Sequence, residues 1–208
     1  MVSYDLEYDD SGKLIGCVDE RGSLNADSAD KIKNGGWRNS NVREVMKDIT
    51  IVIFPGGDDI SHNLYAKPVE WVDSGEDYSF SPERDVSDYI AMSYCLEMDI
   101  PLVGICRGMQ MLSVVSGAEM IQDIPSYFED LSIDYHYEHR NKLPSPGGYR
   151  NFSPHDVDLV KGSVISGIMG VDTVRKCPSW HHQAVMSVEN TGLVVTGTTD
   201  TDGIPIIE

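Results

Sequence analysis

The chain has little basic charge and no long apolar segment. Its 208 residues include 16 lysines and arginines against 34 aspartates and glutamates, a formal net charge of −18. Nucleic acids and anionic membranes are bound through basic patches, so this balance argues against both as partners. No stretch is apolar over the roughly 20 residues that a membrane-spanning helix needs, and the opening residues, MVSYDLEYDD, do not have the pattern of a signal peptide.

Cysteine is also scarce. Cys17, Cys95, Cys106 and Cys177 lie far apart and form no Cys-x-x-Cys pair, which argues against both a disulfide scaffold and a zinc site. We therefore expect a reducing compartment and predict a cytoplasmic protein. Cys95 falls within a helical pattern and is expected to be a small buried side chain.

Cys106 stands in a different context, within Gly104–Gln110. The apolar run Ile100–Val103 before it predicts a short buried strand, and Met111–Ser116 after it predicts a helix that ends at a glycine. A cysteine at such a turn is exposed at a helix N-terminus, where partial positive charge favours the thiolate. The flanking glycines permit the tight turn. Cys106 is therefore predicted to be a nucleophile.

A second glycine-rich turn follows the almost continuously apolar run Ile49–Phe54. That run predicts a parallel strand buried on both faces. In the Pro55–Asp59 turn, glycines allow backbone N–H groups to approach a ligand closely. We interpret the Pro55-Gly56-Gly57 turn as one half of an oxyanion hole and the N–H of Arg107 as the other half, with an ordinary tight turn as the alternative.

The order of predicted elements indicates an α/β fold. Ser81-Pro82-Glu83 has the pattern of a helix start, with serine as N-cap and proline at the first position. Strand, helix, strand, helix implies a parallel sheet with sites at the carboxyl ends of its strands. Residues 1–48 show weak patterning: a short strand at 14–18, then loop with one helical turn over 19–40. Residues 122–156 are expected to be rich in loops, and no internal repeat is apparent.

The last third of the chain predicts short strands. His155–Val160 has the pattern of an edge strand, and residues 184–188, 192–198 and 204–207 have that of antiparallel strands. Asp202-Gly203 is expected to form the hairpin turn between the last two.

Histidines gather in two places. His181 and His182 are adjacent, and on an extended segment they would point to opposite sides, so one could contact substrate, act as a general base or bind a metal, with a structural pair as the alternative. His136 and His139 invite a metal interpretation, but they have no thiolate partner and lie in a predicted loop. A polar loop is favoured there, and no metal is expected.

Taken together, these segments resemble the class I glutamine amidotransferase superfamily. PGGDDISHNLY, SPERDVSDY, GICRGMQML, VVSGAEMIQDI and SWHHQAV follow one another in the order of its γ-glutamyl hydrolase branch, which is typified by γ-glutamyl-γ-aminobutyrate hydrolase, over residues from about 49 to 208. The resemblance implies one glutamine amidotransferase type 1-like domain over residues 1–208. It also implies a flavodoxin-like three-layer sandwich, with a mostly parallel central sheet and a small antiparallel C-terminal addition.

The resemblance further implies a Cys-His-Glu triad acting on a small γ-glutamyl substrate without a cofactor, and it is compatible with a homodimer. The thiolate attacks the γ-carbonyl, the amine leaves, and water hydrolyses the γ-glutamyl thioester. The matching positions are the nucleophile Cys106, the oxyanion donors Gly57 and Arg107, Gln110 near the γ-glutamyl group, and the substrate contacts Trp180 and His181.

The sequence departs from the family in one respect that matters for catalysis. The family's general-base histidine and its glutamate lie in a Gly-x-Gln-x-His-Pro-Glu segment, and the 208 residues contain no His-Pro-Glu. Residues 1–48 do not supply the family's opening strand, helix and strand either. We therefore expect a domain that is incomplete at both ends. The alternatives are a glutaminase domain that feeds ammonia to a synthetase, a catalytically inactive remnant, or a site in which His181 or His182 is the base.

Overall fold

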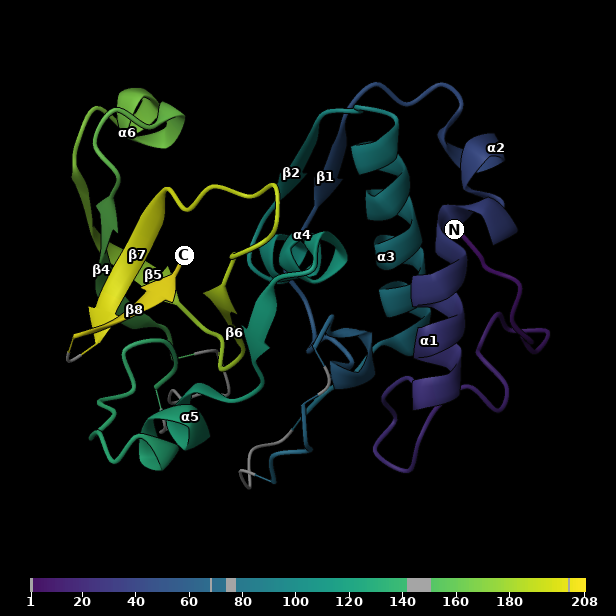
Figure 1. Ribbon diagram of the computed structural model, residues 1–208, viewed down its shortest axis with the longest axis horizontal. Helices are drawn as coiled ribbons and strands as arrows, with labels where there is room; N and C mark the ends of the chain where they lie inside the picture. The colour runs from purple at the N-terminus through teal and green to yellow at the C-terminus, as the bar shows by residue number, and fades with distance from the viewer. Residues whose placement is uncertain (1, 68, 74–77, 142–150, 202) are drawn as a thin grey trace. The chain divides into compact units, whose positions relative to one another are not determined.

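Two compact units make up the chain (Figure 1). The computed structural model describes residues 2–67, 69–73, 78–141, 151–201 and 203–208. One unit comprises Met1–Trp71 with Gly75–Ala118, and the other comprises Val72–Ser74 with Glu119–Glu208. None of the helices in the described ranges combines the length and the apolar composition needed to cross a bilayer.

The N-terminal unit packs helices on a small parallel sheet. Strands β1 and β2 pair in parallel, with Ile53 opposite Val103. Helix α4 packs on both strands, and α3 packs on α4. The elements are α1 (Ala26–Gly35), the 3-10 helix η1 (Gly36–Asn39), α2 (Val42–Met46), β1 (Val52–Phe54), the 3-10 helix η2 (His62–Leu64), α3 (Pro82–Glu97), β2 (Leu102–Gly104) and α4 (Arg107–Ser116).

The second unit is built on a six-stranded sheet in the order β3-β6-β8-β7-β4-β5. Its apolar core lies where α5 meets the sheet and includes Ile124, Phe128, Ala184 and Ile206. Figure 1 shows the C-terminus inside this unit, directly after β8. The elements are β3 (Glu119–Ile121), α5 (Ile124–Asp130), β4 (Ser153–Leu159), α6 (Val164–Met169), β5 (Thr173–Ser179), β6 (Ala184–Ser187), β7 (Gly197–Thr201) and β8 (Ile204–Ile207).

The predicted sheet architecture is wrong, although the fold is still α/β. In place of a mostly parallel central sheet with a small antiparallel addition, every pairing in the larger sheet is antiparallel. Parallel pairing among the described residues is confined to the named strands β1 and β2 and one isolated bridge. Parallel neighbours need a long crossover, which α3 supplies between β1 and β2, whereas β7 and β8 are joined by a tight turn that reverses the chain.

The expected burial of β1 on both faces is also wrong. Phe54 is 4% exposed and lies against α4, but Ile53 is 62% exposed, and Ile51 and Val103 are exposed with it. Side chains alternate along a strand, so one face of this sheet packs under the helix and the other is apolar and open.

The predicted strands of the last third are correct in part. β6 and β8 form close to their expected positions, but β7 begins at Gly197 rather than at residue 192. β4 lies between β7 and β5 instead of at the edge, and neither edge strand, β3 or β5, was predicted. Thr201 pairs with Ile204 across the expected hairpin; Asp202 lies outside the described residues, as do residues 142–150 of the expected loop-rich region.

Residues 1–48 contain more structure than their weak patterning suggests. α1 is a helix of ten residues where a loop with a single helical turn was predicted. Its signals are Asn25, whose side chain accepts a hydrogen bond from the N–H of Ser28, and Gly36, whose positive φ of 55° ends the helix.

A short structural repeat precedes α1, contrary to the expectation of none. Tyr8–Leu14 and Val18–Leu24 are ten residues apart in sequence, and each closes with an antiparallel bridge between its end residues. Asp9 and Asp19 each accept hydrogen bonds from the backbone N–H groups two and four residues later, at 2.8–3.0 Å. The glycine in each turn has a φ of 81°, which explains why both copies place glycine there.

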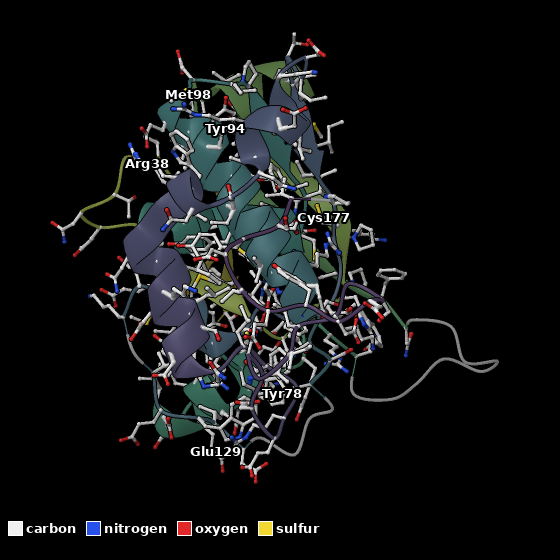
Figure 2. The ribbon with its side chains drawn as sticks, turned by 90° about the vertical axis from the view of Figure 1, so that its right-hand side faces the viewer. Arg38, Tyr78, Tyr94, Met98, Glu129 and Cys177 are labelled. Atoms are coloured by element: carbon white, nitrogen blue, oxygen red, sulfur yellow. The ribbon has the colours of Figure 1, made fainter. Side chains whose placement is uncertain are left out.

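Helix α3 begins and packs largely as its sequence predicts. Ser81 is the N-cap and Pro82 the first helical residue, although the Ser81 hydroxyl donates to Asp58 and accepts no hydrogen bond from the N–H groups of the helix. Cys95 is buried, as expected. Figure 2 shows Tyr94 and Met98 at the carboxyl end of this helix, where the Tyr94 ring packs edge-on against Trp37.

The approach of α4 to β1 depends on glycine. A methyl group added at Gly108 would lie 2.1 Å from the carbonyl oxygen of Phe54, a backbone atom that cannot move aside independently. We predict that Gly108→Ala destabilises the unit by about 3 kcal/mol or more through overpacking. The free energy of unfolding from urea titration measures this.

Gly56→Ala is the matched control, because a methyl group there would make ordinary contacts of 3.5 Å with Cβ and 3.8 Å with Sγ of Cys106. Its stability should stay within about 0.5 kcal/mol of the parent chain. Equal losses in the two variants would contradict the packing argument.

Candidate active site

Cys106 occupies the predicted strand-to-helix turn. It is the N-cap of α4, its side chain is exposed, and its φ of 53° and ψ of −112° are unusual for a residue with a side chain. A methyl group added at Gly104 would lie 2.7 Å from the backbone of Gly108, so the chain can turn this sharply only with glycine on both sides. Such a strained turn holds the thiol away from the strand at the amino end of a helix.

The predicted oxyanion loop lies beside the thiol. The ideal Cβ position at Gly56 is 3.8 Å from Cys106 Sγ. Arg84 on α3 fixes this loop, since its guanidinium donates to the carbonyl oxygens of Gly56 at 3.0 Å and Pro55 at 2.8 Å. A methyl group added at Gly57 would meet Arg84 Nη1 at 2.0 Å, so a side chain there would displace the guanidinium from this position.

Arg107 links the elbow to α3 through a buried ion network. Its side chain is 1% exposed, and its guanidinium donates to the carboxylates of both Asp85 and Asp88. Asp88 also accepts from Arg84 Nε at 3.1 Å, which connects the network to the glycine-rich loop. Asp85 in turn accepts from the hydroxyl and N–H of Ser61, at 2.6 and 3.0 Å.

The carboxylate of Asp85 is completely buried. Burial raises its pKa to about 6, while Arg107 and the Ser61 hydrogen bonds act in the opposite direction. The ionised form is therefore tolerated at neutral pH because the guanidinium accompanies it.

Two further predicted residues belong to α4. The N–H of Arg107 is in the first helical residue, one of the positions that have no acceptor within a helix, so it is available in principle to an oxyanion. Gln110 is buried in the first turn, and its N–H donates to the carbonyl of Cys106 at 3.1 Å.

The remaining predicted residues belong to the second unit, in the connection between β5 and β6. Trp180 packs edge-on against Phe152, and the guanidinium of Arg140 lies 5.2 Å from the centre of its ring. The structure thus brings together Cys106, Gly57, Arg107 and Gln110 within one unit and describes Trp180 and His181 in the other.

The two adjacent histidines have different partners, as their alternation on an extended segment predicts. His182 is buried, and its Nδ1 lies 2.9 Å from Asp123 Oδ1. Asp123 is also the N-cap of α5, where it accepts from the N–H of Ser126 at 3.0 Å. His181 instead turns its Nε2 toward Glu208 Oε2, 3.7 Å away.

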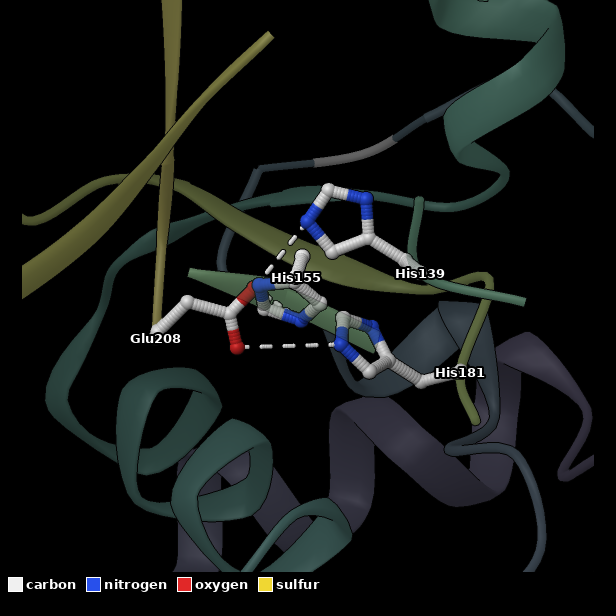
Figure 3. Close-up of side chains that lie close together, drawn as sticks. All are labelled: His139, His155, His181 and Glu208. Atoms are coloured by element: carbon white, nitrogen blue, oxygen red, sulfur yellow. Dashed lines mark ion pairs between the residues drawn. The ribbon is translucent and has the colours of Figure 1, made fainter. Parts of the chain in front are cut away.

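A histidine cluster that the sequence analysis did not foresee surrounds Glu208 (Figure 3). His139 lies in a loop, as expected, but its side chain is 0% exposed. Although burial opposes ionisation, contacts with His139 and His181 lower the pKa of Glu208 to about 2, and burial lowers the pKa of His155. One ligand atom from each of His139, His155, His181 and Glu208 lies within 4.8 Å of the others.

With this geometry established, comparison with known proteins places the chain in a family. Residues 35–208 match the model of the Peptidase C26 family, so the chain belongs to that family. This agrees with the resemblance to class I glutamine amidotransferases on which the sequence analysis rests.

Individual relatives are similar to parts of the chain. A glutamine amidotransferase-like protein of Rickettsia prowazekii is 35% identical over 46% of this chain and 33% of its own length. A CTP synthase of Christiangramia forsetii is 27% identical over 61% of this chain and 25% of its own. A gamma-glutamyl-gamma-aminobutyrate hydrolase of Escherichia coli O157:H7 is 24% identical over 62% and 46%. The chain thus spans less than half the length of each of these relatives.

Several residues around the candidate site were missed by sequence reasoning. Asp85 and Asp88 are one helical turn apart on α3, an (i, i+3) pair that signals a shared face, and the buried arginine opposite them could have been sought from that pattern. Asp123 precedes proline by two residues, a helix-start pattern. His155 and Glu208 had no local signal, since only the fold brings them to His139.

The ion network can be tested by removing one charge or both. Arg107→Met leaves Asp85 buried without its cation and should cost about 3–5 kcal/mol in the free energy of unfolding. The double variant Asp85→Asn, Arg107→Met replaces both charges and should recover most of that loss. Urea titration of both variants measures this, and equal instability of the two would contradict the charge argument.

The Asp123 carboxylate predicts an acid limit for the second unit. Burial acts to raise its pKa, but the hydrogen bonds from His182 and Ser126 prevail and lower it. A lowered folded-state pKa stabilises the fold above the unfolded value of about 3.9, and that stabilisation is lost as the pH falls through the folded value.

Asp123→Asn keeps a capping oxygen but cannot titrate. The difference in unfolding free energy between parent and variant should therefore shrink as the pH falls from about 5 to about 2. Urea titrations across that range measure the difference. Ser126→Ala removes one hydrogen-bond donor to the Asp123 carboxylate, so in that background the difference made by Asp123→Asn should be smaller. A difference that is the same at every pH would rule out the Asp123 contribution.

Proposed function

We propose that this chain carries the nucleophile of a cysteine-dependent hydrolase of γ-glutamyl amides, of which γ-glutamyl-GABA is one candidate. The observation that carries the proposal is the geometry of Cys106, which is exposed at positive φ on the amino end of α4 and has the glycine-rich loop beside its sulfur. Membership of the Peptidase C26 family and the similarity to a gamma-glutamyl-gamma-aminobutyrate hydrolase support it.

The reaction we propose is acyl transfer in two stages. The Cys106 thiolate attacks the γ-carbonyl carbon, and the resulting oxyanion accepts hydrogen bonds from the N–H groups of Gly57 and Arg107. The C–N bond then breaks, the amine leaves with a proton, and a γ-glutamyl thioester remains on the sulfur. Water hydrolyses the thioester, which releases glutamate and restores the thiol.

Arg107 has two separate tasks in this proposal. Its backbone N–H faces the reaction, while its side chain points into the buried network with Asp85 and Asp88. Arg84 fixes the carbonyls of the opposite loop. The two oxyanion donors would therefore be held by one set of ion pairs, which is the preorganisation that such a site requires.

A second candidate function is a glutaminase that supplies ammonia to a synthetase. The similarity to a CTP synthase favours it, and the same thioester chemistry would apply with glutamine as substrate. Gln110 is proposed to contact the γ-glutamyl part that both substrates share. The two functions differ only in the leaving group, which is ammonia in one and a larger amine in the other.

A glutamine analogue with a chloroketone in place of its side-chain amide tests the nucleophile without requiring turnover. We predict that it alkylates Cys106, and that peptide mass spectrometry finds Cys17, Cys95 and Cys177 unmodified. Cys177 is the informative internal control, because it is partly exposed but lies on a strand rather than at a helix N-terminus. Preferential labelling of Cys177 would refute the assignment.

Competition and turnover distinguish the two functions. Protection of Cys106 by γ-glutamyl-GABA but not by glutamine supports the hydrolase, and the reverse supports the glutaminase. Where the chain turns over either substrate, Cys106→Ala should reduce the rate by at least about 10³-fold, given the size of triad-knockout effects. Persistent turnover in that variant would disprove the mechanism.

The source of the general base can be tested in the same assay. The proposed alternatives to a base from a His-Pro-Glu segment are His181 and His182. His182 is the better candidate of the two, because its Nδ1 lies 2.9 Å from the Asp123 carboxylate, the kind of partner that orients a catalytic histidine. His182→Ala would lower turnover at least about 100-fold if His182 is the base. Unchanged turnover in His182→Ala removes that alternative and leaves the nucleophile assignment intact.

A further inference from the structure

We propose that His139, His155, His181 and Glu208 form a binding site for a divalent transition-metal ion, with Zn²⁺ as the best match. All four residues lie in the second unit (Figure 3). His155 is on β4, and Glu208 directly follows β8. His139 precedes β4, and His181 lies in the connection between β5 and β6. The inference is independent of the proposed chemistry of Cys106, which lies in the other unit.

The spacing of the donor atoms fits one ion. His139 Nε2 is 3.0 Å from Glu208 Oε1, and His155 Nε2 is 3.8 Å from the same oxygen. His181 Nε2 is 3.7 Å from the other oxygen of the carboxylate. Tetrahedral Zn²⁺ with bonds of about 2.0–2.1 Å separates its ligands by about 3.3 Å. These three distances bracket that value. The four ligand atoms all lie within 4.8 Å of one another, so the side chains would draw together by up to about 1.5 Å to complete the coordination.

The outer nitrogens of two of the rings indicate which way their lone pairs point. His181 Nδ1 is 2.9 Å from the carbonyl oxygen of Gln183, which can only accept, so Nδ1 carries the proton. In the neutral ring, the lone pair is then on Nε2 and points into the cluster.

The lone pair of His155 is also on Nε2, as its hydrogen bonds through Thr199 indicate. Its Nδ1 lies 2.8 Å from the hydroxyl oxygen of Thr199, and that hydroxyl donates its own hydrogen to the carbonyl of Asp156 at 3.0 Å. The Thr199 oxygen must therefore accept from His155 Nδ1. A hydrogen bond from the outer nitrogen that fixes the inner lone pair is the arrangement found around metal-bound histidines.

The third ring also has an outer partner. His139 Nδ1 lies 3.2 Å from the hydroxyl oxygen of Tyr135, which additionally accepts from the N–H of His139 at 3.1 Å. The Tyr135 ring stacks nearly parallel to the imidazole, with a 15° angle between the planes. Ring orientation is thus fixed from outside at every histidine of the cluster.

The centre of the cluster contains buried polar atoms without a hydrogen-bond partner. His139 Nε2 and Glu208 Oε1 are fully buried, and neither has a hydrogen-bond partner among the described residues, because their 3.0 Å approach is not aligned for a hydrogen bond. Imidazole lone pairs that converge on a buried carboxylate repel it unless a cation lies between them. A metal ion satisfies all of these atoms together.

The ligand types identify the class of metal and its role. Three imidazoles and one carboxylate suit Zn²⁺ and related transition metals better than Mg²⁺ or Ca²⁺, which prefer oxygen ligands. Four protein ligands leave no open position in a tetrahedral site, which is typical of a structural rather than a hydrolytic metal. The ion would join β4 and the end of β8 to two connections, and His181 bound to it would no longer be available to a substrate.

Zinc titration of the chelator-treated 208-residue chain tests the proposal. We expect one equivalent by isothermal titration calorimetry, and Co²⁺ should give the intense visible absorption of a tetrahedral site. Glu208→Gln, which keeps the shape of the side chain, and His155→Ala should each weaken binding more than the loss of an outer partner. Thr199→Val removes only the outer partner and should weaken binding about 10- to 100-fold.

His136→Ala and Cys106→Ala are the controls. His136 is an exposed histidine three residues from His139, and Cys106 is the exposed thiol, so both should leave zinc affinity unchanged. Circular dichroism confirms that each variant is folded. The absence of stoichiometric zinc binding by the parent chain would overturn the proposal. So would binding that survives both Glu208→Gln and His155→Ala, or binding that is lost in either control.

Discussion

The burial of one guanidinium organises the N-terminal unit. Arg107 follows the candidate nucleophile in the chain, and its guanidinium forms ion pairs with two carboxylates on α3. Asp88 passes the connection on to Arg84, which holds the carbonyls of the glycine-rich loop. Because an unpaired buried charge is costly, α3, α4 and the loop are constrained to one arrangement, and the thiol is positioned as a consequence.

Steric constraints act together with this ion network. Gly104 allows β2, and Gly108 allows β1, to approach α4 until a single methyl group would collide with the backbone. Cys106 accepts a strained backbone between them, and the surrounding packing supplies the energy that this strain costs. Because few other residues could occupy these positions, the motif can be recognised from the sequence alone.

The second unit follows a different principle, in which polar groups from distant segments meet in the interior. Asp123 caps α5 and also contacts His182, and the Glu208 carboxylate lies close to the imidazoles of three histidines. These contacts join residues up to 69 positions apart in sequence, from His139 to Glu208, so no periodicity or spacing rule could predict them. The six-stranded antiparallel sheet brings them together, and that sheet is the feature of the fold that the sequence analysis described wrongly.

The sequence by itself determined the elbow around Cys106, the start of α3 and the membership of a family, because each depends on residues that are close in the chain and chemically restricted. It also held the signals of α1, a capping asparagine and a terminal glycine, although they were overlooked. Only the tertiary structure decided the exposure of Ile53, the sheet order and the burial of His139. Those properties depend on which segments become neighbours, and an apolar run or a histidine pair is compatible with many neighbours.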